Sequence, residues 1–207
     1  MVNCNTLEEQ YLLHLQLEKI LFDNIVAKTL LKNDQFRLTL DRLCYEIIEN
    51  YPAVNEKCII GIQERGIFLA ERIAERLTML ERGSKMNVGK LDITFYRDDY
   101  RIRTEPIKAS ETDIEFDIDG KDVILVDDVL FSGRTIHAAM AALQDFGRPS
   151  KIELLVMVDR RFNRHLPIQP NYTGIVVDAY DEAYVKVEYN HVEEEDKILL
   201  FSAKTAK

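Results

Sequence analysis

The sequence predicts an α/β protein in which a mostly parallel sheet carries helices on both faces. Segments with the two-residue period of strands alternate with segments that have the period of helices. Residues 123–126, Val-Ile-Leu-Val, are wholly apolar, which is typical of a central strand in a parallel sheet. The chain has 207 residues, 46% of them hydrophobic, which suits one such domain with additions.

The N-terminal region is expected to be helical. Residues 5–32 are rich in Leu and Ile and contain neither Gly nor Pro, a pattern that predicts one or two amphipathic helices. We therefore interpret residues 1–34 as a helical extension for packing or oligomerisation, and residues 35–207 as the main domain. A further helix is predicted from about Asp34 to Asn50, ending near Pro52.

The main domain then alternates between the two periods. Apolar residues recur at helical spacing over 67–77, and again over 136–143 before Gly147 and Pro149 end the helix. Strands are predicted at 58–62, 91–96, 123–126, 152–158, 175–177, 185–189 and 198–201. In such open sheets, ligands bind beyond the carboxyl ends of the strands, so we look for chemistry in the loops there.

Composition excludes several classes of protein. The net charge of −9 excludes a globally basic nucleic-acid binder. The three cysteines form no CxxC pair, which argues against a zinc site or a disulfide framework and for a reducing compartment. The first basic residue, Lys19, follows Glu8 and Glu9, which is unlike a signal peptide, and the apolar runs are too short to span a membrane. We expect a cytoplasmic protein without membrane contact.

The most informative segment is 123–135, VILVDDVLFSGRT. A buried strand leads into Asp127 and Asp128, and a short loop then delivers Ser132, Gly133 and Thr135 to the start of a helix. Unpaired amides and the positive end of the helix dipole attract a phosphate there. Two carboxylates would repel that phosphate unless they bind something else, and sugar hydroxyls or hydrated Mg²⁺ are suitable partners. The pattern therefore predicts a sugar-phosphate site.

This segment resembles the phosphoribosyl-pyrophosphate (PRPP) motif of type I phosphoribosyltransferases. Over about residues 35–200 the chain is similar to the PyrR family of uracil phosphoribosyltransferases, which also attenuate transcription of pyrimidine operons. The similarity rests on GIQERGIFLA at 61–70, DITFYRDD at 92–99, FGRPS at 146–150, VDR at 158–160 and LPI at 166–168. It implies a type I phosphoribosyltransferase fold with a small hood segment at about 160–174.

The resemblance also implies the reaction and its residues. Uracil and PRPP would form UMP and pyrophosphate with Mg²⁺ as cofactor. Asp127 and Asp128 would hold the ribose diol, stabilise positive charge and bind Mg²⁺ through water. Arg97 and Asp98 would act catalytically from a mobile loop that closes over PRPP. The 5′-phosphate and ribose would contact the two acids and Val129, Leu130, Phe131, Ser132, Gly133, Arg134 and Thr135.

A second anion site is expected where a strand meets the next helix. By resemblance, Glu64, Arg65 and Gly66 form the pyrophosphate loop. Arg65 and the Gly66 amide would be its ligands, because a cation and a helix N-terminus both attract phosphate. Glu64 is a departure, because a neutral or basic residue would suit pyrophosphate better. It leaves PRPP affinity unaffected only if its side chain points away from pyrophosphate or binds Mg²⁺.

The base site is the least specified part. By resemblance, Arg160, Ile168 and Val177 would contact the nucleobase, although core packing explains Ile168 and Val177 equally well. The residues at 161–165, RFNRH, depart from the Gly-His-Arg pattern of the family. A phosphoribosyltransferase for another base, such as a purine, therefore stays open.

RNA binding is the alternative from another functional class. The family reads RNA through the helix before the first strand, where this chain keeps Arg42 but has Asp41 and Tyr45. Asp41 repels phosphate, so a pyrimidine-responsive RNA attenuator is not favoured over the enzyme. A homodimer or higher homo-oligomer is expected.

Overall fold

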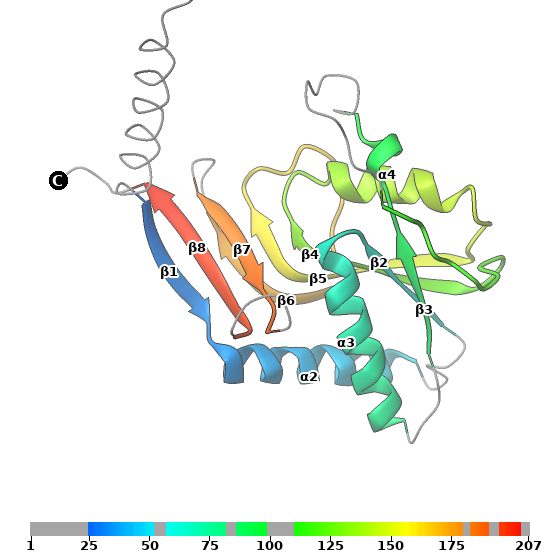
Figure 1. Cartoon of the computed structure of the whole chain (residues 1–207), viewed down its shortest axis with the longest axis horizontal. Helices are drawn as coiled ribbons and strands as arrows, with labels where there is room; N and C mark the ends of the chain where they lie inside the picture. The colour runs from blue at the N-terminus through cyan, green and yellow to red at the C-terminus, as the bar shows by residue number, and fades with distance from the viewer. Residues whose placement is uncertain are drawn as a thin grey trace, which may run out of the picture.

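The computed structural model describes residues 25–51, 57–81, 86–98, 110–179, 183–190 and 195–203. Figure 1 shows the elements in space. In chain order they are β1 (Ile25–Leu31), α2 (Asn33–Asn50), β2 (Cys58–Ile62), α3 (Arg65–Leu80), β3 (Asn87–Leu91), a 3-10 turn (Thr94–Tyr96), β4 (Asp122–Leu130), α4 (Arg134–Leu143), β5 (Lys151–Arg161), β6 (Tyr172–Asp178), β7 (Tyr184–Glu188) and β8 (Lys197–Ala203).

The main sheet has five strands in the order β3-β2-β4-β5-β6, and every neighbouring pair is parallel. Successive residues of its strands point to opposite faces, as pleating requires. Ile59 packs into the core that α2 and α3 cover, whereas Ile60 packs into the core that α4 covers. The predicted α/β architecture, with helices on both faces of a parallel sheet, is confirmed.

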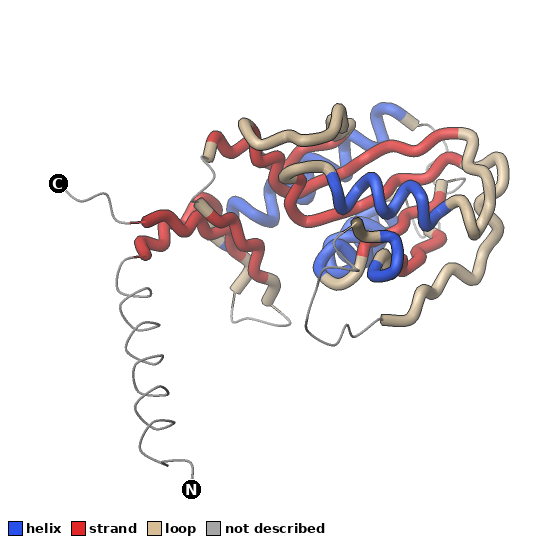
Figure 2. The backbone as a smooth tube through the Cα atoms, turned by 90° about the horizontal axis from the view of Figure 1, so that it is seen from above, coloured by secondary structure: helices blue, strands red, loops and turns tan. Residues whose placement is uncertain are grey.

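A second, antiparallel sheet has the order β1-β8-β7 and lies beside the main sheet (Figures 1 and 2). Its buried side chains Val187, Tyr189 and Ile198 join the core beneath α2 and α3. The strands predicted at 185–189 and 198–201 therefore exist and form this second sheet with β1, whereas the strand predicted at 175–177 is β6 of the main sheet. The packing of the second sheet brings β7 against the start of α3.

Two sequence predictions were wrong. Residues 25–31 form strand β1 and not part of a helical extension, because they pair with β8 from the far end of the chain. Residues 94–96 form a 3-10 turn, because the Asp92 carboxylate accepts hydrogen bonds from the Thr94 amide and hydroxyl and ends the strand. The rest of the proposed extension, residues 1–24, lies outside the described residues. Among the described residues, no helix has the length and apolar character needed to cross a bilayer.

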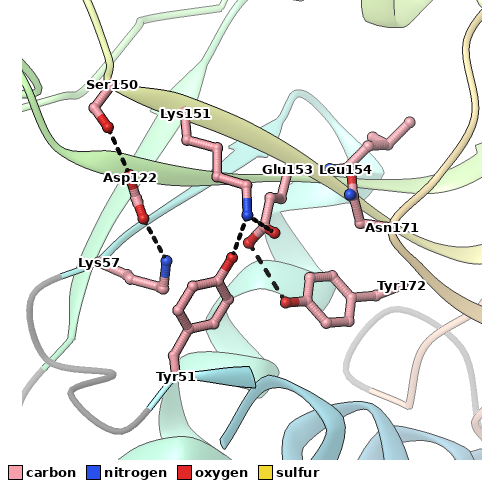
Figure 3. A network of polar contacts seen from close by, with 9 residues as sticks. All are labelled: Tyr51, Lys57, Asp122, Ser150, Lys151, Glu153, Leu154, Asn171 and Tyr172. Atoms are coloured by element: carbon pink, nitrogen blue, oxygen red, sulfur yellow. Dashed lines mark hydrogen bonds and ion pairs between the residues drawn. The ribbon is translucent and has the colours of Figure 1, made fainter. Parts of the chain in front are cut away.

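The amino ends of the central strands carry a polar network (Figure 3). Lys57 Nζ lies 2.9 Å from Asp122 Oδ2 and 3.0 Å from the centroid of the Tyr51 ring. Lys151 Nζ lies 2.7 Å from the Tyr51 hydroxyl and 2.6 Å from Glu153 Oε1. These paired charges lie at the amino end of the sheet, and the predicted site residues lie at its carboxyl end.

Candidate active site

The acid pair lies within β4, which continues four residues beyond the predicted strand to Leu130. Asp127 is only 7% exposed, and its Oδ1 accepts a hydrogen bond of 2.9 Å from the Asp128 amide. Burial, and then the negative charge of Asp128, raise the pKa of Asp127 well above its usual value. Two carboxyl groups therefore lie together in a buried place, where their ionised forms need a cation or a hydrogen-bond donor as a partner.

A cavity of about 200 Å³ opens where β4 passes into α4. Gly133 takes a left-handed conformation, φ +89°, and a Cβ there would lie 3.3 Å from Ile168 Cδ1. The absence of a side chain lets the backbone turn tightly into the helix. The cavity is lined by Arg97, Asp127, Val129, Leu130, Phe131, Ser132, Gly133, Arg134, Thr135 and Ile136. All the residues predicted to bind the 5′-phosphate and ribose, except Asp128, thus line one cavity at the N-terminus of a helix.

The predicted pyrophosphate loop meets the acid pair from β2 and α3. A Cβ on Gly66 would lie 2.5 Å from the Val126 carbonyl oxygen, so the start of α3 rests on the backbone of β4. The pKa of Asp128 is raised by burial, and the positive charge of Arg65 opposes that rise. Glu64 is exposed. The start of α3, with the predicted pyrophosphate residues Arg65 and Gly66, therefore lies against β4 beside the acid pair.

The segment after β3 is tied at both ends by Asp92. Its Oδ1 accepts a hydrogen bond from the Thr94 amide at 2.8 Å, and its Oδ2 accepts one from the Ser110 amide at 2.7 Å. Arg97 lines the phosphate cavity. Asp98 forms an ion pair with Arg134, at the first position of α4. Residues 99–109 of the predicted mobile loop lie outside the described residues.

The three predicted base contacts lie on three segments: Arg160 on β5, Val177 on β6, and Ile168 between these two strands. Arg160 and Val177 face each other across β5 and β6 and are 5% and 7% exposed. The guanidinium carbon of Arg160 lies 4.0 Å from the centroid of the Phe131 ring, so this residue supports the phosphate loop from below. Ile168 contacts Gly133 and lines a separate cavity of about 490 Å³.

Two supports of the phosphate loop had no assigned role in the sequence. Arg164 donates from Nη1 to the Phe131 carbonyl at 2.7 Å and forms an ion pair with Asp159. The His165 and Leu166 amides both donate to the Ser132 carbonyl, at 3.0 and 3.2 Å. Only the excess of arginines after β5 hinted at this arrangement, because the partners are separated by about thirty positions.

Comparison with known proteins identifies the family of this chain. The phosphoribosyl transferase domain family matches residues 26–191. The chain is 43% identical over 178 residues to "Bifunctional protein PyrR" from Bacillus mycoides (strain KBAB4) and from Bacillus cereus (strain B4264). Each alignment covers 84% of this chain and 97% of the relative. The chain belongs to the PyrR family. This phosphoribosyltransferase family is the one that its sequence motifs predicted.

Solved structures support the fold of this PyrR-family chain. A hypoxanthine-guanine phosphoribosyltransferase from Bacillus anthracis matches with a TM-score of 0.59 and 19% identity, covering 72% of this chain and 83% of that protein. The hypoxanthine phosphoribosyltransferase of Trypanosoma cruzi matches with a TM-score of 0.63 and 16% identity, covering 85% and 97%. At these identities the likeness concerns the fold alone, and the predicted phosphoribosyltransferase fold is confirmed.

Proposed function

We propose that this PyrR-family chain is a Mg²⁺-dependent uracil phosphoribosyltransferase that forms UMP and pyrophosphate from uracil and PRPP. The observation that carries the proposal is the cavity of about 200 Å³ at the start of α4, which the buried Asp127 lines together with the 129–135 loop. A sugar phosphate needs both parts within one short span. The close approach of Gly66 to β4 supports a second anion site beside the acids.

In this reaction the bond between the anomeric carbon of PRPP and pyrophosphate breaks, and a bond to the base nitrogen forms as that nitrogen releases its proton to the departing pyrophosphate or to water. Asp127 and Asp128 hold the ribose hydroxyls and stabilise the positive charge that develops on the sugar. The 129–135 loop holds the 5′-phosphate, and Arg65 and the Gly66 amide hold the departing pyrophosphate. The protein therefore contributes mainly orientation and electrostatics.

The acid pair suits a magnesium ion. Mg²⁺ keeps several waters and is usually held by one or two carboxylates together with substrate phosphate oxygens. Asp127 and Asp128 supply such carboxylates, and within the described residues no cluster of three or more His, Cys, Asp or Glu forms a complete metal cage. When bound, the ion neutralises charge on pyrophosphate and makes it a better leaving group.

The test is a product assay with the purified full chain. The protein is incubated with PRPP, Mg²⁺ and one of uracil, hypoxanthine, guanine or orotate, and the nucleotide is identified by chromatography. We expect UMP from uracil, no nucleotide from the other bases, and no product when EDTA replaces Mg²⁺. Product from a purine alone would overturn the assignment of uracil, and no product from any base would overturn the enzyme proposal for these acceptors.

RNA binding is the second candidate, because the relatives named above are called bifunctional. On α2, the negative charge of Asp41 is paired with Arg76, whose Nε lies 2.6 Å from Asp41 Oδ1. The pairing reduces the repulsion that Asp41 would exert on RNA phosphates. A gel shift of an RNA hairpin that weakens steeply with salt and strengthens with UMP would support this function, and no shift at low salt would contradict it.

The cellular compartment and the oligomeric state of the enzyme are also part of the proposal. The described cysteines, Cys44 and Cys58, are buried free thiols, which suits a reducing cytoplasm. We expect a homodimer or a higher homo-oligomer. Sedimentation of the purified chain with and without PRPP measures its size, and a monomer under both conditions would contradict that expectation.

A further inference from the structure

Helix α3 holds the β7–β8 hairpin at two points. Arg65 and Arg72 are two helical turns apart and so lie on one face of α3. Arg65 donates to the carbonyl oxygen of Val187 in β7. Beyond the end of β7, Arg72 Nη1 lies 2.6 Å from Asp196 Oδ1, and its Nη2 donates to Asn190 Oδ1. The hairpin therefore contacts the helix both at its predicted pyrophosphate end and two turns further on.

The second attachment is a compact cluster in which Asn190 is exposed, whereas Arg72 and Asp196 are mostly buried. The backbone amide of Asn190 donates to the same Asp196 oxygen, Oδ1, at 2.8 Å. The side chains of Arg72 and Asp196 are 20% and 10% exposed. Charge-assisted hydrogen bonds such as that between Arg72 and Asp196 are stronger than neutral ones, so this cluster holds the end of β7 in a defined place on α3.

Tyr189 packs between the two attachments. It is fully buried, with edge-to-face contacts to Phe36 and Phe68 at centroid separations of 5.9 and 5.7 Å. The guanidinium carbon of Arg72 lies 5.4 Å from its ring centroid. Burial raises the pKa of Tyr189, and the charge of Asp128 adds to this rise. The end of β7 is therefore packed close to the acid pair as well as to α3.

We propose that Arg72 and Asp196 are positioning residues that act through Arg65 on the pyrophosphate end of PRPP. This inference deepens the proposed function and rests on it. The cluster fixes the hairpin, the hairpin places the Val187 carbonyl, and that carbonyl holds Arg65 at the start of α3. An arginine held in advance loses less conformational freedom when it binds an anion, so the cluster strengthens PRPP binding without touching PRPP.

The test compares Asp196→Asn and Arg72→Gln with the unmodified chain. We expect KM for PRPP to rise about tenfold, the effect of losing about one charge-assisted hydrogen bond. KM for uracil and kcat should change less than about twofold, because neither the base site nor the acids are moved. Lys197→Gln is the matched control, since Lys197 Nζ lies 3.1 Å from Glu188 Oε2 within the same hairpin. We expect this control to behave like the unmodified chain.

A double-variant experiment separates positioning from general loss of structure. If Asp196 acts through Arg65, then Asp196→Asn should cause no further loss of PRPP affinity in an Arg65→Gln background. A purely structural role would give additive losses and would also weaken uracil binding. Thermal unfolding identifies variants that do not fold. Asn190→Ala, which removes only one acceptor of Arg72, then replaces Asp196→Asn.

Titration calorimetry with PRPP keeps this inference separate from the proposed function. If the unmodified chain binds PRPP but makes no UMP, the proposed function fails, and the variants still test the inference through PRPP affinity. Unchanged affinity in both Asp196→Asn and Arg72→Gln, or additivity with Arg65→Gln, would overturn the inference alone. Absence of PRPP binding by the unmodified chain would overturn both.

Discussion

Arg134 and Asp98 form an ion pair that joins the first residue of α4 to the segment after β3. Arg134 Nε also lies 3.5 Å from His165 Nδ1, in the segment that follows β5. One arginine therefore contacts two of the segments around the phosphate cavity. Both partners of the ion pair are more than half exposed, so its value lies in orientation more than in stability.

We predict that Asp98→Asn lowers kcat about tenfold while changing the free energy of unfolding by less than about 1 kcal/mol. Arg134 would keep its charge but lose the partner that orients it. Steady-state kinetics and urea unfolding check the two halves of this prediction. Asp145→Asn is the control, since Asp145 accepts from Tyr96 of the same segment and does not line the cavity. An unchanged kcat in Asp98→Asn would contradict the orienting role.

Asp127→Asn should separate catalysis from stability. Because the pKa of Asp127 is raised, the folded state binds more protons than the unfolded state between about pH 4 and the raised pKa, and stability falls as pH rises through that interval. Asparagine removes this penalty. We therefore expect Tm at pH 7.5 to be equal or higher than in the unmodified chain, although kcat falls at least about a hundredfold.

The pH dependence of Tm checks the direction of this stability effect. The stability advantage of Asp127→Asn should shrink as pH falls toward 4 and vanish below about pH 3, where the carboxyl is protonated in both the folded and the unfolded state. Asp128→Asn should give a smaller gain in stability, because the charge of Arg65 opposes the rise in the pKa of Asp128. A large drop in Tm for Asp127→Asn at pH 7.5 would show that the carboxylate is a net stabiliser and that this explanation is wrong.

Gly66→Ala should damage both stability and PRPP binding. The new Cβ would lie 2.5 Å from a backbone oxygen of β4, and neither β4 nor the start of α3 can move without moving the acid pair. We expect a loss of about 2 kcal/mol or more in the free energy of unfolding. Gly120→Ala, where a Cβ would have no atom within 4 Å but φ is +67°, should cost only about 1 kcal/mol and leave PRPP affinity unchanged. Equal effects of the two substitutions would contradict the close-packing argument.

The polar network at the far end of the sheet should affect stability and not activity. Lys57→Met removes the cation beside Asp122, whose pKa Lys57 lowers, and should cost about 1–2 kcal/mol at pH 7. A lowered carboxyl pKa contributes stability above the usual value near 4, and that contribution is lost as pH falls through the lowered pKa. The difference from the unmodified chain should therefore narrow at about pH 3 in urea unfolding. A kcat changed more than about twofold would show that this network is coupled to the active site.

The local sequence was sufficient wherever an element depends on neighbours along the chain. The strand, loop and helix of 122–143 were predicted because the apolar run, the two acids and Gly133 lie within a dozen positions of one another. The phosphate cavity was predictable for the same reason, since a single turn brings nearly all its lining residues together. The resemblance to the PyrR family rested on such contiguous blocks, and the comparisons confirmed it.

Tertiary contacts decided the remainder. The Leu-rich pattern at 25–31 is compatible with a helix, and only pairing with β8, from the far end of the chain, makes it a strand. Residues 94–96 fit a strand pattern but form a 3-10 turn, because the Asp92 carboxylate accepts a hydrogen bond from the Thr94 amide. The contact between Arg65 and Val187 joins positions 122 residues apart, and no periodicity encodes such a pair. Sequence alone determined most of the elements and the phosphate motif, because hydrophobic period and turn chemistry act locally. Which elements meet at the acid pair was decided by packing in three dimensions, because contacts between distant residues leave no local pattern.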